Sequence, residues 1–86
     1  RVPSVKLEKA ANILKAVAHP IRLAVIDLLE QREELNVGEL QLILKVEQAL
    51  LSHHLIHLKD KGLLSCRRDG KNIYYRLADQ HITGII

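Results

Sequence analysis

The sequence lacks several features on which other classes of protein depend. One cysteine among 86 residues cannot form an internal disulfide, so nothing indicates an oxidising compartment. No apolar run approaches the roughly 20 residues that span a bilayer, and no charged start precedes an apolar stretch with a small-residue cleavage site. We therefore expect a cytoplasmic protein.

Aromatic residues are also scarce, with no Phe or Trp and only two Tyr. Even so, 48% of the residues are hydrophobic and 27% are charged, which is typical of a globular chain. A chain of 86 residues fits one small domain, of a size that subunit association commonly stabilises. We predict a single domain over residues 1–86. Because the sequence starts at Arg1 rather than Met and ends in an apolar stretch, we expect flanking residues.

Signatures of catalysis are missing as well. There is no Gly-rich phosphate-binding loop, no acidic pair with a histidine, and no Ser or Cys nucleophile beside a base. We predict a protein that is not an enzyme and uses no cofactor.

The net charge of +3 is unevenly distributed. Residues 1–43 carry six basic and six acidic residues, residues 44–77 carry seven and three, and residues 78–86 carry one Asp alone. The whole basic excess therefore lies on 44–77. Such a segment can be the electrostatic footprint of a nucleic acid or simply a solvated basic surface.

Hydrophobic spacing predicts four helices, a β-hairpin and a last helix, in that order. The first helix is expected to be capped by Ser4 and to end near His19-Pro20, and the second to begin at Pro20. A charged linker covers 31–35. The third helix should begin at the cap Asn36, and the fourth should run from residue 47 or 48 to near Gly62.

After Gly62 the period changes. Segments 63–68 and 72–77 can pair as strands around Asp69-Gly70, although Asp-Gly-Lys-Asn can also form a longer loop. Beyond Leu77 the helical spacing returns.

The fourth helix has two distinct faces. At about 100° per residue, Leu51, Leu55 and Leu58 share one narrow sector and should be buried. The opposite face is short and polar near its start, so base edges in a DNA major groove can approach it closely. The third helix ends two or three residues earlier, the spacing of a helix-turn-helix. The face and its flanks comprise Gln48, Ala49, Ser52, His53, Ile56, His57, Lys59 and Asp60.

The histidines of this helix allow different roles. His53 and His57 are spaced i, i+4, which can bind zinc on a helix, but neither Cys nor a well-placed carboxylate clusters nearby. His53 is instead expected to meet DNA. His54 points about 60° from the core centre and is interpreted as a semi-buried structural residue bonded to backbone.

These residues resemble the ArsR-type (ArsR/SmtB) winged-helix repressors, and the resemblance covers nearly the whole chain. Its most specific parts are His19-Pro20-Ile21-Arg22, Gln48 through Leu55, Gly62-Leu63, and Arg67-Arg68-Asp69-Gly70-Lys71 leading to Tyr74-Tyr75.

The resemblance implies a mostly α-helical winged helix-turn-helix of bacterial origin that dimerises and usually responds to an effector. It implies base or groove contacts by Gln48, Ser52 and His53. From its place on the exposed face of the fourth helix, Ala49 is expected to be able to touch a thymine methyl. It also implies phosphate or minor-groove contacts from the wing by Arg67, Arg68 and Lys71.

Two positions depart from the family pattern. Glu47 stands where a small hydroxyl residue is common and would repel phosphate, and Ile56 stands where a basic residue is common. We expect operator affinity to be lower or differently distributed.

The resemblance further implies dimerisation through the first and last helices. A two-fold dimer would place two recognition helices about 34 Å apart on an inverted repeat. The expected interface residues are Leu7, Ala11, Leu14, Ile82, Ile85 and Ile86.

The sequence does not identify the effector that releases such a repressor from DNA. Metal-sensing relatives often carry a Cys-x-Cys pattern where this sequence has Asn36 and Gly38, so that soft-metal site is absent. Asp79 and His81 match half of a second family zinc site, although Asp79 can equally be a helix N-terminal charge. Cys66 is interpreted as a packed, inert cysteine rather than a reactive thiol.

We therefore predict a dimeric, sequence-specific DNA-binding repressor of an inverted-repeat operator, with no membrane partner and an unknown effector. The alternatives are a winged-helix module for protein contacts and a zinc-responsive repressor that uses Asp79 and His81.

Overall fold

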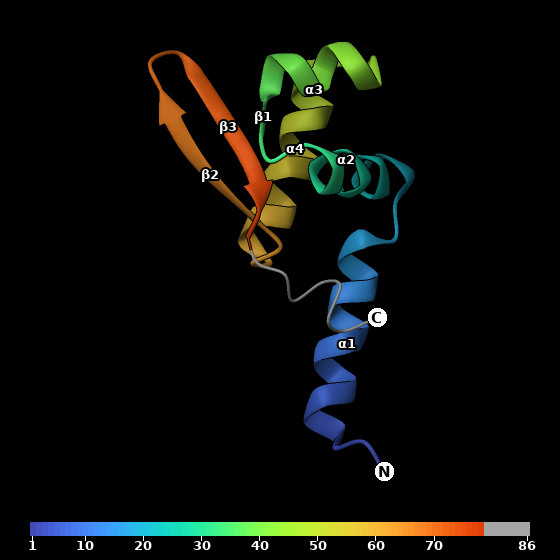
Figure 1. Cartoon of the computed structure of the whole chain (residues 1–86). Helices are drawn as coiled ribbons and strands as arrows, with labels where there is room; N and C mark the ends of the chain where they lie inside the picture. The colour runs from blue at the N-terminus through green and yellow to red at the C-terminus, as the bar shows by residue number, and fades with distance from the viewer. Residues whose placement is uncertain (79–86) are drawn as a thin grey trace.

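The computed structural model describes residues 1–78, which form four helices and a small antiparallel sheet (Figure 1). The sheet order is β1-β3-β2, so the last strand lies between the other two. The elements are α1 (Ser4–Val17), α2 (Pro20–Gln31), β1 (Leu35–Asn36), α3 (Val37–Leu44), α4 (Gln48–Asp60), β2 (Leu64–Asp69) and β3 (Asn72–Leu77). The predicted fold class is confirmed, while the predicted last helix falls outside the described residues.

The starts of the helices follow their local sequence, with one exception. Pro20 is the first residue of α2, as predicted, and the cap His19 accepts a hydrogen bond at Nδ1 from the Ile21 amide at 3.1 Å. The prediction that Ser4 caps α1 is wrong. Pro3 occupies the cap position without a side-chain hydrogen bond, and Ser4 is already helical.

Strand β1 is absent from the sequence-based prediction, which placed these residues in a linker and at a cap. Leu35 pairs with Tyr75 and Asn36 with Tyr74, which extends the hairpin to three strands. Two residues are too short to show the alternation that marks a strand. Asn36 also caps α3 as predicted: its Oδ1 accepts from the Glu39 amide at 2.7 Å, and Glu39 accepts from the Asn36 amide at 2.9 Å.

The hairpin has a two-residue loop, because Asp69 pairs directly with Asn72. The longer loop that Asp-Gly-Lys-Asn allows does not form. Gly70 takes a φ of +63°, a left-handed conformation that two-residue hairpin loops require and that glycine adopts without a steric penalty.

The core lies between α2, α3, α4 and the sheet. Leu51, Leu55 and Leu58 are fully buried there, as the spacing of α4 predicts. By contrast, α1 projects from the body (Figure 1), and only its C-terminal half contributes to the core, through Ala16 with Ile13 and Val17 beside it. No helix in residues 1–78 is long and apolar enough to cross a membrane.

Candidate nucleic-acid interface

Helix α4 stands at the surface on a buried apolar base. A turn of three residues, 45–47, separates it from α3, and Lys45 adopts a left-handed φ of 54° in that turn. Of the predicted reading residues, Gln48, Ala49 and His53 are exposed and Ser52 is half-buried. The first half of α4 therefore presents short polar side chains on a helix whose opposite side is fixed in the core.

The start of α4 carries a negative charge. Glu47 is the N-cap, and its Oε2 accepts a hydrogen bond from the Leu50 amide at 2.9 Å. This bond satisfies an amide that has no partner inside the helix and places an anion at the positive end of the helix dipole. The departure from the family pattern at this position therefore has a structural role in α4.

His54 is the one buried polar side chain among residues 1–78. Its Nδ1 accepts a hydrogen bond from Arg22 Nε at 2.9 Å, and Arg22 Nη1 donates to the Ala16 carbonyl, also at 2.9 Å. The structural role predicted for His54 is confirmed, but the side chain is buried rather than semi-buried, and its partner is the Arg22 side chain and not backbone. Arg22 thereby joins the end of α1 to α4.

The pKa of His54 is lowered, first by burial and then by the charges of His19 and Arg22. The His19 ring lies 4.3 Å from the His54 ring, between centroids. An Nδ1 that accepts from a guanidinium cannot itself hold a proton. The geometry and the lowered pKa therefore both describe a neutral imidazole.

His53 and His57 of α4 do not assemble into a metal site within the described residues. No three His, Cys, Asp or Glu side chains of residues 1–78 are grouped so that they could hold a metal ion. The i, i+4 pair of His53 and His57 therefore finds no third ligand there. The pKa of His57 is lowered, chiefly by partial burial.

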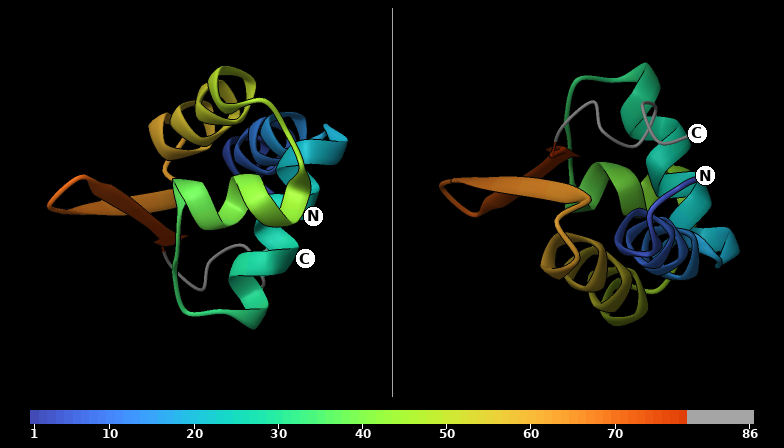
Figure 2. Two further views of the ribbon diagram at one scale, coloured as in Figure 1. Left: turned by 90° about the horizontal axis from the view of Figure 1, so that it is seen from above. Right: turned by 90° about the horizontal axis from the view of Figure 1, so that it is seen from below.

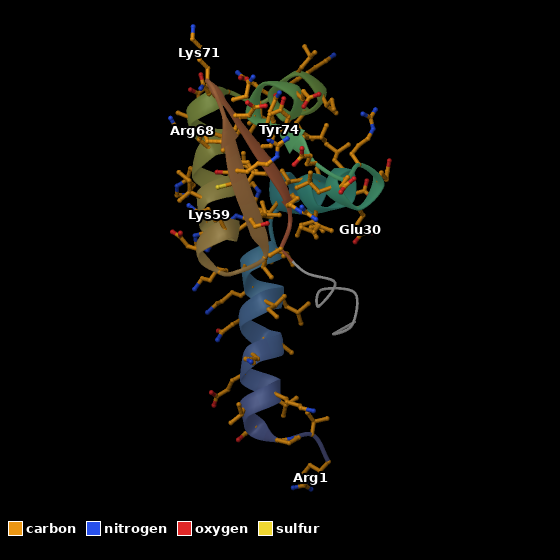
Figure 3. All side chains as sticks on the ribbon, turned by 60° about the vertical axis from the view of Figure 1, so that its left-hand side comes forward. Arg1, Glu30, Lys59, Arg68, Lys71 and Tyr74 are labelled. Atoms are coloured by element: carbon orange, nitrogen blue, oxygen red, sulfur yellow. The ribbon has the colours of Figure 1, made fainter. Side chains whose placement is uncertain are left out.

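The hairpin projects from one side of the helical body (Figure 2) and forms a wing beside α4. Lys71 lies at its tip and Arg68 further down the same hairpin, both exposed (Figure 3). Arg67 behaves differently, because it forms an ion pair with Glu34 and its guanidinium lies 4.5 Å from the centre of the Tyr74 ring. This pairing raises the pKa of Arg67 and lowers that of Glu34.

Cys66 is exposed on β2, so its interpretation as a packed cysteine is wrong. Burial along this strand ends after Leu64 and Ser65, where the wing leaves the body and the helices no longer cover it. The projection of the wing is a property of the tertiary structure that strand spacing alone does not reveal.

Of the six residues predicted to form a dimer interface, three lie in the described part of the chain. Leu7 and Leu14 are 55% and 56% exposed on α1, and Ala11 is also exposed. The other three, Ile82, Ile85 and Ile86, lie outside the described residues, as do Asp79 and His81.

Sequence reasoning missed two residues that organise this surface. Arg22 belongs to the His19-Pro20-Ile21-Arg22 motif, one of the segments on which the family resemblance rests. The motif does not indicate which residue the arginine contacts. Glu34 lies in a charged linker, where nothing in the spacing marks it as the partner of a residue 33 positions away.

A helix-turn-helix whose inner side is buried in the core, with an adjoining β-hairpin, defines a winged helix-turn-helix. Residues 19–65 match the family model described as "Bacterial regulatory protein, arsR family". The chain is 36% identical to the transcriptional repressor PagR of Bacillus anthracis, over all of this chain and 86% of that protein. The chain therefore belongs to the arsR family of bacterial regulatory proteins, a family of transcriptional regulators and not an enzyme class.

Solved structures agree with this assignment. The PagR crystal structure matches with a TM-score of 0.83 and 36% identity, over 96% of this chain and 94% of that one. Reduced HlyU from Vibrio cholerae N16961 matches with a TM-score of 0.88 and 33% identity, over 95% of this chain and 85% of that one. The homodimeric winged helix-turn-helix DNA-binding domain Mb0332 from Mycobacterium bovis matches with a TM-score of 0.80 and 32% identity, over 95% of this chain and 75% of that one.

Proposed function

We propose that this protein is a dimeric transcriptional repressor that binds an inverted-repeat operator, with residues 1–86 as its single DNA-binding domain. The observation that carries the proposal is the exposed polar face of α4, held on a buried leucine base beside a basic wing. In this arrangement Gln48, Ala49, Ser52 and His53 read base edges. Arg68 and Lys71 contribute phosphate contacts, which supply salt-dependent affinity and fix the register.

A dimer is supported by the apolar side of α1. Leu7 and Leu14 are two helical turns apart and expose most of their apolar surface to solvent. The homodimeric relative Mb0332 shows that this fold forms dimers. Ile82, Ile85 and Ile86, which lie outside the described residues and for which the sequence predicts a last helix, are proposed to complete the same interface.

Selection of bound duplexes from a random or genomic pool tests the proposal directly. We expect enrichment of a sequence with two related half-sites in inverted orientation. Absence of enrichment at low salt would show that the protein is not a DNA-binding repressor and would favour a module for protein contacts.

Substitutions on α4 should change which sequences are selected. We expect Gln48→Ala or His53→Ala to relax the base preference at one position in each half-site. Each variant should bind the preferred wild-type sequence less tightly by about 1–3 kcal/mol. The selection is repeated with each variant, and Gln31→Ala, at an exposed position at the end of α2, provides the control in which the preference should not change. Unchanged preference in both variants would exclude these side chains from base reading.

Substitution of Arg68 should act on all sequences alike. We expect Arg68→Ala to weaken binding to specific and random duplexes by a similar factor and to reduce the slope of log K against log salt by about 0.9 per lost phosphate contact. Fluorescence anisotropy over a salt series measures this. A change confined to one sequence would instead assign Arg68 to base reading.

The effector remains a separate question from DNA binding. We propose zinc only as the first ion to test, because Asp79 and His81 could supply two ligands. Equilibrium zinc titration of the protein, with Asp79→Ala and His81→Ala for comparison, tests whether these residues bind zinc. If the wild-type protein binds no zinc, neither residue is a zinc ligand.

A further inference from the structure

A row of side chains crosses the outer face of the sheet. Arg67 on β2 pairs in register with Tyr74 on β3, and Tyr74 pairs with Asn36 on β1. Successive side chains on a strand alternate between faces, and the neighbouring Leu35 and Tyr75 are buried on the core side. Arg67 and Tyr74 therefore lie on the face that points away from the helices.

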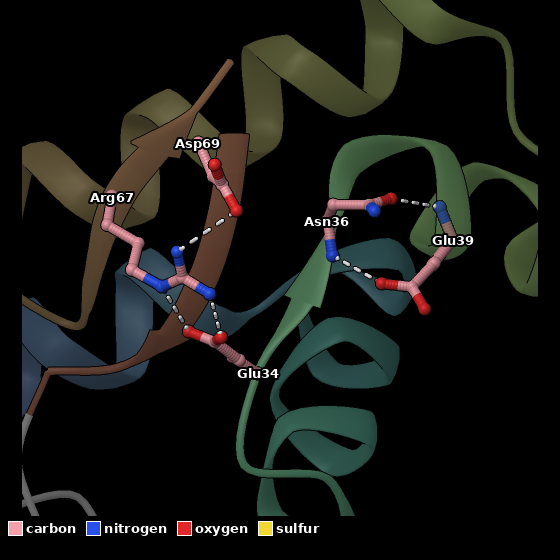
Figure 4. A network of polar contacts seen from close by, with 5 residues as sticks. All are labelled: Glu34, Asn36, Glu39, Arg67 and Asp69. Carbon is pink, nitrogen blue, oxygen red and sulfur yellow. Dashed lines mark hydrogen bonds and ion pairs between the residues drawn. The ribbon is translucent and has the colours of Figure 1, made fainter. Parts of the chain in front are cut away.

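Arg67 spans this face to reach the segment before β1 (Figure 4). Its Nε donates to Glu34 Oε2 at 3.0 Å, and its Nη2 donates to Glu34 Oε1. The guanidinium lies over the Tyr74 ring, and Nη1 is 3.9 Å from Asp69 Oδ2. A bidentate ion pair of this kind fixes orientation as well as distance.

The same contacts make Arg67 less available to bind a phosphate group. Two carboxylates face its single charge, and Glu34 takes two of its five N–H donors, so a DNA phosphate gains less from Arg67 than from an unpaired arginine. Arg68 lies on the opposite face of the strand and forms no ion pair with any residue in 1–78. The two adjacent arginines therefore have different environments.

The pairing also connects the wing to the helix-turn-helix. Only two residues separate Glu34 from α3, and one of them, Asn36, both pairs with Tyr74 and caps α3. Without Glu34 the hairpin is held against β1 by two residue pairs alone. The base of the hairpin is fixed by Leu64 and Tyr75 in the core, so the Glu34 contact acts on the part beyond them, where the residues of β2 are exposed.

We propose that Glu34, Arg67 and Tyr74 form a wing latch, which sets the angle of the hairpin relative to α3 and α4 so that Arg68 and Lys71 meet the DNA backbone. Arg67 is then a positioning residue and not a phosphate contact. This inference rests on the proposed function in DNA binding. It replaces the role that the family resemblance implies for Arg67.

The test measures binding of the selected duplex over a salt series for wild type, Glu34→Gln, Arg67→Ala and the exchanged pair Glu34→Arg with Arg67→Glu. We expect each single variant to weaken specific binding by about fivefold, the upper range for an exposed ion pair, with the wild-type salt slope. The exchanged pair should recover only part of the loss, because it restores the ion pair but loses the contact with the Tyr74 ring and places a carboxylate near Asp69. Arg68→Ala is the matched control in which the slope falls.

Hydrogen exchange of the hairpin amides in the free protein gives a second measurement. We expect faster exchange in Glu34→Gln and Arg67→Ala, intermediate exchange in the exchanged pair, and near wild-type exchange in Arg68→Ala. All these residues are at least partly exposed, so the variants should fold.

Three results would overturn the proposal. A slope in Arg67→Ala that falls as in Arg68→Ala would make Arg67 a phosphate contact. Tighter binding with a steeper slope in Glu34→Gln would make Glu34 a competitor of DNA. Hairpin amides that exchange as slowly in Glu34→Gln and Arg67→Ala as in wild type would also exclude a latch. If wild type binds no duplex, the proposed function fails instead, and the exchange data alone decide whether the latch holds the wing.

Discussion

Replacement of Arg22 by alanine is expected to lower the free energy of unfolding by about 2–4 kcal/mol. The substitution removes two hydrogen bonds and leaves the buried Nδ1 of His54 and the Ala16 carbonyl without their donor. A buried polar group left unpaired costs about 1–3 kcal/mol, and the lost packing of the Arg22 stem adds to this. Urea denaturation measures the change.

The exposed residue Arg32, at the end of α2, provides the control. Arg32→Ala should change stability by no more than about 0.5 kcal/mol, as surface substitutions usually do. An effect of Arg22→Ala as small as that of Arg32→Ala would show that the junction between α1, α2 and α4 does not depend on this side chain.

The same junction makes stability dependent on pH. Burial, His19 and Arg22 lower the pKa of His54, with further contributions from His53 and His57 on its own helix. Below the ordinary value of 6.5, the unfolded chain therefore binds more protons than the folded one. Stability should be fully present above about pH 6.5 and should fall as pH decreases toward the folded pKa.

Denaturation at a series of pH values, with His54→Asn for comparison, tests this expectation. Asparagine can place an acceptor near the position of Nδ1 but does not titrate. The variant should therefore show a shallower decline between about pH 6.5 and pH 5, with a remainder from His57, whose pKa is also lowered. Parallel curves would show that His54 does not control the decline.

Introduction of charge on α1 should have the largest effect on DNA binding. We expect Leu7→Glu combined with Leu14→Glu to convert the dimer into monomers, because each carboxylate would enter an apolar interface without a partner. Loss of the second half-site contact should then weaken operator binding by about 100-fold or more. Sedimentation equilibrium gives the association state, and anisotropy gives the affinity.

Asn12→Glu is the matched control, since Asn12 is exposed on the same helix about 150° from Leu7 and Leu14. It should leave both measurements near wild type. A double variant that remains dimeric, or a monomer that binds the operator as tightly as wild type, would contradict the proposed role of α1.

Much of the fold could be predicted because it depends on local signals. The apolar sector of α4, Pro20 at the start of α2 and Asn36 before α3 each act within one or two turns of helix, and the structure confirms them. Strand β1 could not be predicted in the same way. Its two residues are a strand only because β3 lies beside them.

The site was predictable to a lesser extent. The residue spacing on α4 correctly predicted that Leu51 and Leu55 are buried and that His53 is exposed, because all three positions lie on one helix. The partners of Arg67 and His54 depend on segments more than 30 residues away. Side chains of this kind find their partners through tertiary structure, which residue spacing does not encode.

The cap of α3 limits how this chain could acquire a thiolate sensor. Asn36 and Gly38 stand where thiol-using relatives carry cysteines, and a Cβ at Gly38 would lie 3.4 Å from Asn36 Oδ1, in ordinary contact. The two positions are therefore close enough for paired thiols. However, Asn36→Cys would remove the capping box, at a cost of about 1 kcal/mol. A pair of thiols at these positions would thus begin with a less stable α3, and metal binding by the same thiols would offset that loss.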